Sequence, residues 1–371
     1  MLHRLETLVN QESGTYNKQG VDRVGETLTK WFSDLGFVIT EDVQQDRGNN
    51  LIGYYKGAKD AKIIVLAHMD TVFKEGTVNV RPFSKDEQYA YGPGVFDMKA
   101  SIVVLYEALV ELKKTQEELL ENVAILFNSD EEVGSIHSRA WIEEHAREKS
   151  FALILEPTRD KQRVCNARKG GGKYYLHLYG KASHAGMAHR HGESAVEELA
   201  LLIPKLHALT DYDEGVTVNV GLIEGGTSVN TIAPYAYAGI DLRMETIEQA
   251  EQFDKLIRAQ IEKKSQFRDY LARVQKWNFS STFRSRRLRT ITSLRARSRQ
   301  KHGVGHRSRK KTGGGSDGNL TSYIGIPTID GLGPVGGNAH QEDEYVDISS
   351  LEERKEFLKA LLLRLTDAAK K

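Results

Sequence analysis

The chain has 371 residues, of which 39% are hydrophobic and 28% are charged, and its formal net charge is +1. This length predicts two domains, and the nearly balanced charge argues against a global basic field for nucleic acid. The N-terminal sequence MLHRLETLVN has no apolar core of signal-peptide length, and no run approaches the roughly 18 apolar residues of a membrane span. We therefore expect neither a cleaved secretion signal nor a membrane span. Cys165 is the only cysteine, so we expect no intrachain disulfide and a cytoplasmic location.

The first part of the chain alternates short apolar runs with a helical pattern. The runs at 63–67, 123–127 and 151–155 contain β-branched residues and end at polar residues, which favours strands of a sheet covered on both faces. Residues 99–114 carry apolar side chains at helical spacing and predict a covering helix. This alternation predicts an α/β domain with a central, mostly parallel sheet. Open sheets of this kind bind ligands at the carboxyl ends of their strands, so the polar residues there are functional candidates.

The pattern changes at about Gly170. Three glycines at 170–172 predict a flexible joint. The residues that follow predict strands and helices in the order β-α-β-β-α, at 173–179, 193–209, 216–222, 235–243 and 246–264. This order predicts a smaller α+β domain of ferredoxin-like type, inserted into the first domain. We therefore assign residues 1–168 and 277–371 to the larger domain and residues 169–276 to the insert, with a final amphipathic helix at 351–369.

Five residues of metal-ligand type follow predicted strands or lie in glycine-rich loops, namely His68, Asp97, Glu132, Glu156 and His340. Each has a structural alternative when it is considered alone. His68 could be a hydrogen-bonded loop histidine, Asp97 could cap the helix that follows it, and Glu132 could belong to a solvated acidic turn. The argument for a metal site therefore depends on their combination.

Two histidines and three carboxylates, one of them bridging, can give each of two zinc ions one nitrogen, one terminal carboxylate and a shared oxygen ligand. Asp70 follows His68 by two residues and suits a carboxylate that orients its ring. Two zinc ions about 3.5–4 Å apart can polarise a carbonyl group and activate a water molecule. Glu131 is the spare acid that could accept the proton of this water, so the combination predicts a hydrolase.

These segments resemble the zinc metallopeptidases of the glutamate carboxypeptidase (carboxypeptidase G) type, which share a superfamily with aminoacylases and with acetylornithine and succinyl-diaminopimelate deacylases. The resemblance covers nearly the whole chain, in family order. Its motifs are HMDTV (68–72), AYGPGVFDMK (90–99), LFNSDEEVGS (126–135), LEPT (155–158), GKASHAG (180–186), VNTIAP (229–234), TGGGSD (312–317) and HQEDEYVDIS (340–349).

The resemblance implies a role for each matched residue. His68 and Glu156 would bind one zinc ion, Glu132 and His340 the other, and Asp97 would bridge them, with cobalt or manganese as substitute metals. Asp70 would orient His68, and Glu131 would act as general base. His184 would steady the oxyanion, often from the partner subunit of a homodimer. Asn230, Arg243 and Gly315 would lie near the substrate, where the Arg243 guanidinium suits a carboxylate. The inserted domain would be a lid that dimerises.

The resemblance implies a zinc-dependent exopeptidase that cleaves an amide bond beside a free carboxylate and removes a C-terminal residue such as glutamate. An N-acyl-amino-acid deacylase is the alternative, because both reactions hydrolyse an amide next to a carboxylate. The expected partner is thus a small peptide or an N-acyl amino acid. A non-catalytic homologue that still binds metal is a further alternative, and nucleic acid is not an expected partner.

One segment departs from the family pattern. No aspartate or glutamate occurs between Tyr270 and Ser316, and residues 277–311 are rich in arginine, lysine and serine. A polyanion-binding insert, a disordered basic loop and a reading-frame shift restored just before Thr312 are three explanations. Family-like sequence on both sides favours the third. We expect such a chain to be destabilised, because losing a covering helix exposes apolar surface at about 25 cal/mol per Å².

Overall fold

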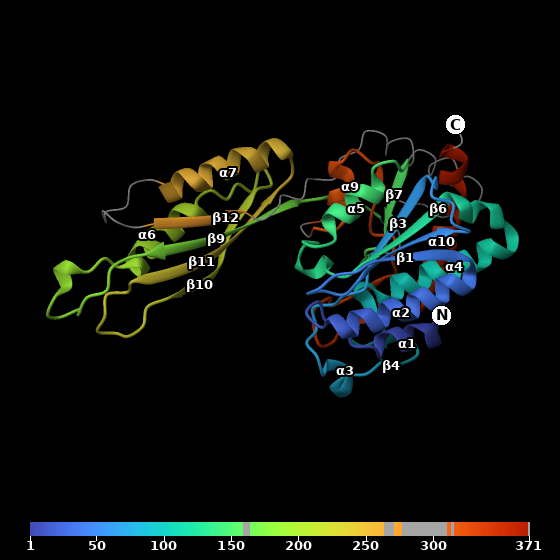
Figure 1. The fold of residues 1–371 in the computed structure, drawn as a ribbon, viewed down its shortest axis with the longest axis horizontal. Helices are drawn as coiled ribbons and strands as arrows, with labels where there is room; N and C mark the ends of the chain where they lie inside the picture. The colour runs from blue at the N-terminus through green and yellow to red at the C-terminus, as the bar shows by residue number, and fades with distance from the viewer. Residues whose placement is uncertain (159–163, 263–270, 277–309, 313–314, 370–371) are drawn as a thin grey trace. The chain divides into compact units, whose positions relative to one another are not determined.

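The computed structural model describes residues 1–158, 164–262, 271–276, 310–312 and 315–369, and Figure 1 shows their fold. The described residues form two compact units. Unit 1 contains residues 1–167, 310–312 and 316–369, and unit 2 contains residues 168–276 together with Gly315. Each unit has a hydrophobic core of its own.

Unit 1 is built on a six-stranded sheet with the strand order β1-β2-β6-β3-β7-β14. Strands β6, β3, β7 and β14 run parallel to one another, whereas β2 pairs antiparallel with both β1 and β6. The strands are β1 (Phe37–Asp42), β2 (Asn50–Tyr55), β3 (Ile63–His68), β6 (Val123–Asn128), β7 (Phe151–Ile154) and β14 (Thr328–Ile329). The prediction of an α/β domain with a mostly parallel sheet is confirmed.

Helices cover both faces of this sheet, as Figure 1 shows. Every residue of β2, β3 and β6 is buried, which explains why these strands appear in the sequence as nearly continuous apolar runs. One face packs against α1 (Leu2–Val9), α2 (Lys18–Leu35), α4 (Ala100–Thr115) and α10 (Ile348–Ala369). The opposite face packs against α5 (Arg139–Ala146) and α9 (Gly318–Tyr323).

Local sequence signals define the ends of α2. Its N-cap residue, Asn17, accepts a hydrogen bond from the Gly20 backbone N–H at 2.9 Å, which satisfies one donor that the helix itself leaves unpaired. Its C-cap, Gly36, has a φ of 109°, a left-handed conformation that glycine adopts without a Cβ clash. Residues next to the helix therefore set both of its ends.

Short elements complete unit 1. A four-stranded sheet has the order β15-β16-β5-β4, and β8 pairs with β13. These elements are α3 (Thr77–Val80), β4 (Ser84–Lys85), β5 (Tyr89–Tyr91), η1 (Val95–Lys99), η2 (Glu117–Asn122), η3 (Glu131–Val133), β8 (Cys165–Arg168), β13 (Lys310–Thr312), β15 (Gly336–Gly337) and β16 (Tyr345–Asp347). Most of the segment 277–311, for which we prefer a reading-frame shift, lies outside the described residues.

Unit 2 is an antiparallel four-stranded sheet with the order β10-β11-β9-β12, and helices α6 and α7 contribute to its core. Its elements follow one another as β9 (Gly170–Tyr179), α6 (Ala195–His207), β10 (Thr217–Gly225), β11 (Tyr235–Met244), α7 (Ile247–Glu262) and β12 (Leu271–Lys276), with the short turn η4 (His189–His191) before α6. The order βαββαβ with the first strand in the interior is ferredoxin-like, as predicted.

The prediction of a flexible joint at Gly170–Gly172 is wrong. These glycines are the first residues of β9 and pair with Met244, Arg243 and Leu242 of β11. A Cβ atom on Gly171 would lie 3.2 Å from Nη1 of Arg243. Glycine therefore serves here to let a long side chain approach the strand closely.

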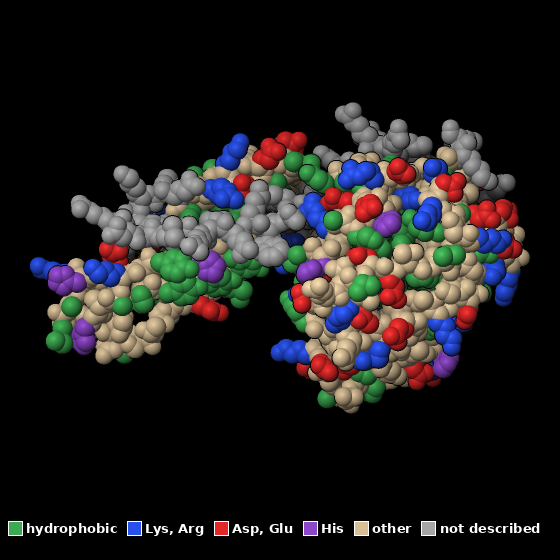
Figure 2. All heavy atoms as spheres, viewed as in Figure 1, with side chains coloured by type: hydrophobic (Ala, Val, Ile, Leu, Met, Phe, Trp, Pro, Cys, Tyr) green, Lys and Arg blue, Asp and Glu red, His purple; other side chains and the backbone are tan. Residues whose placement is uncertain are grey.

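The helices and the surface charges of the described residues bear on the expected absence of a membrane span and on the charge balance. Among them, no helix is long and apolar enough to cross a membrane. Figure 2 shows acidic and basic side chains interspersed on the visible face of unit 1. This mixture agrees with the balanced charge of the sequence.

Candidate metal centre

The residues predicted as metal ligands come from five separate places in unit 1. His68 is the last residue of β3, Glu156 follows the end of β7, and Glu132 lies in η3 just after β6. Because β3, β6 and β7 are parallel neighbours, their carboxyl ends meet at one edge of the sheet. Asp97 comes from η1 and His340 from the loop before β16. The fold thus explains how segments far apart in sequence converge.

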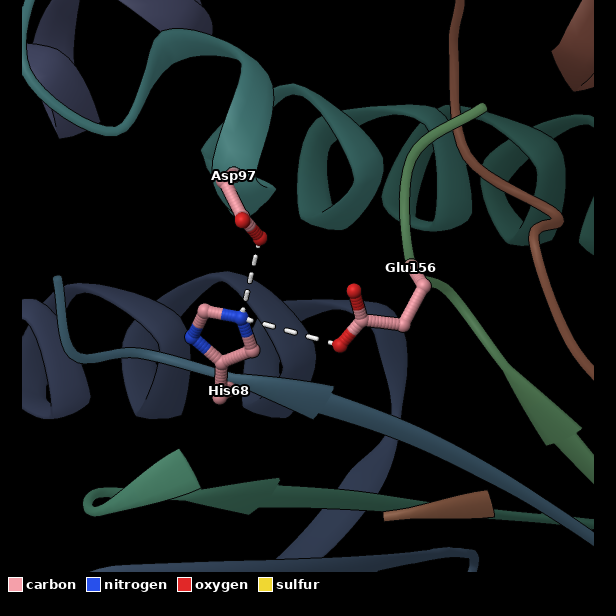
Figure 3. A group of neighbouring side chains, drawn as sticks. All are labelled: His68, Asp97 and Glu156. Carbon is pink, nitrogen blue, oxygen red and sulfur yellow. Dashed lines mark hydrogen bonds and ion pairs between the residues drawn. The ribbon is translucent and has the colours of Figure 1, made fainter. Parts of the chain in front are cut away.

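Asp97 lies between two pairs of candidate ligands. Its Oδ1 is 3.2 Å from Nε2 of His68, and its Oδ2 is 3.4 Å from Nε2 of His340. On one side, Nε2 of His68 lies 3.9 Å from Oε1 of Glu156, as Figure 3 shows. On the other side, Nε2 of His340 lies 3.1 Å from Oε2 of Glu132. The five residues therefore form two groups that share Asp97, each with donor atoms within 4.8 Å of one another.

Asp97 does not cap the helix that follows it. Its φ and ψ of −115° and 93° are non-helical, and the N-cap position of α4 is Lys99. The side chain of Asp97 is only 14% exposed, and its two oxygens face His68 and His340. The structure therefore contradicts the alternative that Asp97 is a helix cap.

The ring of His68 has a defined orientation. Its Nδ1 lies 2.9 Å from the backbone carbonyl oxygen of Asp70, which can only accept, so Nδ1 carries the proton in the neutral ring. Nε2 is then a lone-pair donor that faces Asp97 and Glu156. The Asp70 carboxylate is more distant, at 3.5 Å. Orientation of His68 by Asp70 thus occurs chiefly through its backbone.

The Asp70 carboxylate supports the neighbouring turn η3. Oδ1 accepts the Glu131 backbone N–H at 3.1 Å and Oδ2 accepts the Glu132 N–H at 3.3 Å. The hydroxyl of Thr15 donates to the same carboxylate at 2.7 Å. Asp70 is therefore buried but fully engaged, and it fixes the backbone from which Glu131 and Glu132 project.

Glu131 is partly buried beside the candidate ligands. Burial and then the charge of Glu156 raise the pKa of Glu131 well above its usual value, and Asp317 and Glu132 act in the same direction. A carboxylate with a raised pKa is a stronger base near neutral pH. The environment of Glu131 therefore suits the predicted general base and contradicts a solvated acidic turn.

The histidines and carboxylates perturb one another strongly. Burial opposes the charged form of His68, but Asp70 and Asp97 outweigh it and raise its pKa well above the usual value. Asp97 and Glu132 raise the pKa of His340 to about 10. Burial also opposes the Asp97 carboxylate, but His340 and His68 outweigh it and lower the pKa of Asp97. Each imidazole thus has the electrostatic environment of a cation site.

The residues present fit a metal centre. Five carboxylates converge here on two histidines, so the cluster has an excess of negative charge, the members being Asp70, Asp97, Glu131, Glu132, Glu156, His68 and His340. In addition, Oε1 of Glu132 is buried and has no hydrogen-bond partner in the described part of the chain. A buried carboxylate oxygen without a donor is costly unless a cation compensates it. Imidazole and carboxylate ligands together suit a borderline cation.

Glu344 and Lys99 are buried residues near Asp97 for which the sequence predicts no role. The Glu344 carboxylate accepts backbone N–H groups of Phe96 at 2.8 Å and of Asp97 at 3.1 Å, and burial raises its pKa to about 7. Lys99 is buried, donates to the Gln11 carbonyl at 2.9 Å, and has its pKa lowered by burial to about 8. Both residues lie within recognised motifs, but nothing in the motif letters indicates their backbone partners.

Unit 2 brings His184 and Asn230 into adjacent segments. His184 forms an isolated bridge with Thr231, and the Ala185 N–H donates to the Asn230 carbonyl at 2.9 Å. Nδ1 of His184 accepts the backbone N–H groups of Gly186 and Met187, both at 3.1 Å. The neutral ring therefore carries its proton on Nε2, which is the arrangement of a hydrogen-bond donor.

Arg243 and Gly315 form a second cluster in unit 2. Nε of Arg243 donates to Oδ2 of Asp241 at 2.9 Å, and its Nη1 would lie 3.9 Å from a Cβ on Gly315. Arg168 donates to the Gly315 carbonyl at 3.2 Å. The predicted substrate residues Arg243 and Gly315 are thus neighbours.

These two clusters lie at opposite ends of β11. His184 and Asn230 adjoin the loop before Tyr235, whereas Arg243 is next to the last residue of the strand. At about 3.3 Å per residue, the eight steps between Tyr235 and Arg243 span roughly 26 Å. Within one copy of unit 2, His184 and Arg243 are therefore too far apart to contact the same small molecule.

Sequence comparisons identify related proteins. Residues 64–364 match Peptidase family M20/M25/M40. The chain is 30% identical over 379 residues to carboxypeptidase G2 of Pseudomonas sp., an alignment that covers 98% of this chain and 89% of that protein. It is also 30% identical over 236 residues to an acetylornithine deacetylase of Pasteurella multocida, covering 59% of this chain and 60% of that protein.

Solved structures share the fold. An aminopeptidase from Bacillus cereus aligns with a TM-score of 0.79 and 25% identity over 97% of this chain and 96% of its own. A metallo-carboxypeptidase of family M20 from Sulfolobus solfataricus aligns with a TM-score of 0.80 and 18% identity, over 98% and 99% of the two chains, and this likeness concerns the fold alone. The expected fold class and superfamily are thereby confirmed. The chain belongs to peptidase family M20/M25/M40, a family of hydrolytic enzymes.

Proposed function

We propose that this protein is a two-metal carboxypeptidase that hydrolyses an amide bond adjacent to a free carboxylate, with glutamate as the leading candidate for the released residue. The observation that carries the proposal is the position of Asp97, whose two oxygens face His68 and His340 at 3.2 and 3.4 Å. A carboxylate that lies between two histidines in this way is suited to bridge two metal ions. A peptidase of the same family from Bacillus subtilis, of similar fold at 15% identity and a TM-score of 0.71, is described as dinuclear and metal-binding.

Each metal position would have one histidine and one glutamate of its own. His68 and Glu156 would hold one ion, His340 and Glu132 the other, and Asp97 both. Zinc is the proposed metal, since it accepts imidazole and carboxylate together. When bound, two such ions would polarise the scissile carbonyl and acidify the attacking water.

Glu131 would move the proton during the reaction. Its partly buried carboxylate would accept a proton from the water as the water oxygen attacks the carbonyl carbon. When the C–N bond breaks, Glu131 would return this proton to the leaving nitrogen. The products are a new carboxylate and a free amine, so the protonation state of Glu131 is restored. Its raised pKa makes Glu131 a stronger base than an exposed glutamate.

Unit 2 would supply the groups that recognise the substrate. Nε2–H of His184 would donate to the oxygen that becomes negative as the carbonyl is attacked. The guanidinium of Arg243, held at Nε by Asp241, would bind the free carboxylate of the substrate with Gly315 beside it, and Asn230 would act with His184 at the other end of β11. These roles follow from the family motifs together with the local geometry.

The protein would act as a homodimer. Tyr235, next to the segment that pairs with His184, lies roughly 26 Å from Arg243 along β11 by strand geometry. Two chains must therefore contribute if His184 and Arg243 both contact one substrate. Strand β10 is an edge of its sheet, and Leu222 and Ile223 on it are 61% and 62% exposed. An exposed apolar edge strand suits association with a second copy.

Metal analysis paired with a substrate panel tests the proposal. We expect about two zinc ions per chain and hydrolysis of folyl- or peptidyl-glutamate. Metal-free protein should be inactive and should recover on addition of Zn²⁺. A chain that holds zinc but hydrolyses no amide in the panel would instead be the non-catalytic homologue.

An N-acyl-amino-acid deacylase is the second candidate, because the acetylornithine deacetylase is as similar in the region it aligns. The same panel separates the two functions when N-acetyl amino acids are included. A deacylase would prefer N-acetyl substrates to peptidyl-glutamate. Carboxypeptidase G2, however, aligns over more of this chain and is the better guide to its activity.

A further inference from the structure

The loop that carries His340 also carries a buried acid, Glu344, four residues further along the chain. Glu344 is 0% exposed, and its oxygens accept backbone N–H groups from the segment around Asp97. Oε1 accepts from Phe96 at 2.8 Å and from Asp97 at 3.1 Å, and Oε2 lies 3.4 Å from the Gly94 nitrogen. The Glu344 side chain therefore accepts the backbone N–H groups of Gly94, Phe96 and Asp97, which lie about 250 residues earlier in the chain.

These donors belong to the backbone that sets the direction of Asp97. Gly94 has a φ of 73°, and a Cβ there would lie 2.5 Å from Cγ2 of Thr71, so this turn is confined to one shape. Asp97 itself adopts non-helical φ and ψ inside η1. Orphan N–H groups in such an irregular segment need an acceptor, and Glu344 provides it.

We propose that Glu344 is a positioning residue that aligns Asp97 between His68 and His340. It fixes the Asp97 backbone through Oε1, and it belongs to the same loop as His340, so it sets the two ligands relative to each other. Buried Lys99 lies nearby and contributes positive charge to Glu344. This inference rests on the proposed two-metal site, because its consequence is the metal affinity.

Two substitutions separate positioning from simple charge. Glu344→Gln retains an oxygen in the place of Oε1 and can keep the bonds from Phe96 and Asp97. Glu344→Asp retains the charge but is one methylene shorter, so it cannot reach these donors equally well. We expect E344D to weaken Zn²⁺ binding by about 10–100-fold, the usual effect of losing a residue that orients a metal ligand. We expect E344Q to weaken it by less than about tenfold, the effect of one long hydrogen bond.

The measurement is a competition titration of metal-free protein with Zn²⁺ and a chromophoric chelator, combined with thermal melting of the metal-free forms. E342Q and E342D are the matched controls, because Glu342 is an exposed acid on the same loop. They should bind Zn²⁺ as the unmodified protein does.

Three results would overturn the inference. The first is E344D with unchanged Zn²⁺ affinity, whether or not its metal-free form melts lower, since Glu344 would then affect only the stability of the fold. The second is E344Q with a larger loss than E344D, which would assign the effect to charge. The third applies if E344D does not fold: E344Q then decides alone, and a loss of Zn²⁺ affinity of a hundredfold or more in E344Q would overturn the inference. An unmodified protein that binds no Zn²⁺ would instead refute the proposed two-metal function.

Discussion

Three consecutive acids after β6 have three different environments. Asp130 accepts the His137 backbone N–H at 2.7 Å and the Ser138 hydroxyl at 2.5 Å, so it stabilises the turn toward α5. Glu131 lies partly buried among other carboxylates, and Oε2 of Glu132 lies 3.1 Å from Nε2 of His340. Adjacent residues of the same chemical type thus have separate tasks because their backbone directions differ.

We expect the substitutions Glu131→Gln and Glu132→Gln to affect different properties. E131Q removes the proton acceptor but no metal ligand, so kcat should fall by about 10²–10⁴-fold with zinc content unchanged. E132Q removes a ligand, so zinc content should fall from about two ions toward one. Metal analysis and steady-state kinetics on the same samples provide the measurement. Loss of zinc in E131Q would contradict the assignment of Glu131 as a base.

The candidate ligands could be selected from the sequence, whereas the residues that support them could not. His68, Glu132 and Glu156 each follow an apolar strand, and this position is visible in the sequence. Thr15 and Glu344 act through contacts with residues 55 and about 250 positions away, and no local pattern records such partners. The role of Asp70 was predicted as a carboxylate contact to His68, but its carboxylate chiefly holds the Glu131–Glu132 turn.

Helices α4 and α10 are joined by a group of charges at the surface of unit 1. Glu111 of α4 pairs with both Lys355 and Lys359 of α10, and Glu352 pairs with Lys355 at 2.7 Å. Glu111, Glu352 and Glu356 also form a cluster of metal-ligand type, but their carboxylates already have lysine partners. The cluster is therefore best explained as an ion-pair network that holds the two helices together.

The stability contributed by Glu111 should depend on pH. The hydrogen bonds from Lys355 and Lys359 lower the pKa of Glu111 from its usual 4.5 to about 2. A lowered pKa in the folded state stabilises the fold above the unfolded pKa, and this contribution disappears as the pH falls from about 4.5 to about 2. Because the side chain is 36% exposed, solvent screening limits the contribution to about 0.5–1 kcal/mol.

We therefore expect Glu111→Gln to lower the free energy of unfolding at pH 7 and to have little effect near pH 2. Denaturant unfolding of the metal-free proteins provides the measurement, since acid would also release bound metal. Glu118→Gln, at an exposed position near the end of α4, is the control and should be neutral at both pH values. An equal effect of E111Q at pH 7 and pH 2 would show that its packing, not its charge, stabilises the fold.

The main strands and helices were predictable because their patterns are repeated over many residues. The run at 63–67 became β3, and the helical spacing at 99–114 became α4. The glycines at 170–172 misled the prediction, because glycine commonly marks a turn and here makes room for Arg243 in a strand. Strands β14, β15 and β16 have only two or three residues each, too few for a period to be visible.

At the scale of the whole molecule, the residues proposed for the chemistry and those proposed for recognition lie in different units. All five candidate ligands, Glu131 and Glu344 lie in unit 1, whereas His184, Asn230, Arg243 and Gly315 lie in unit 2. The length of the chain and the change of pattern at residue 170 predicted the two domains. The separation of His184 from Arg243 along β11 became visible only when the strand was placed between them.

This separation predicts complementation between two inactive variants. If each active site takes Arg243 from one chain and His184 from the other, then His184→Ala and Arg243→Ala homodimers should both be inactive. A mixed dimer should contain one site with both residues intact and one with neither. Random assembly from equal amounts should therefore restore about a quarter of the normal activity.

Coexpression of the two variants with different affinity tags, followed by purification of the doubly tagged dimer, sharpens the test. The purified mixed dimer should have about half the unmodified activity, because one of its two sites is complete. Mixing H184A with itself under two tags is the control and should remain inactive. A mixed dimer without activity would mean that one chain supplies both residues. One substrate would then have to contact residues near both ends of β11, although the strand is ten residues long.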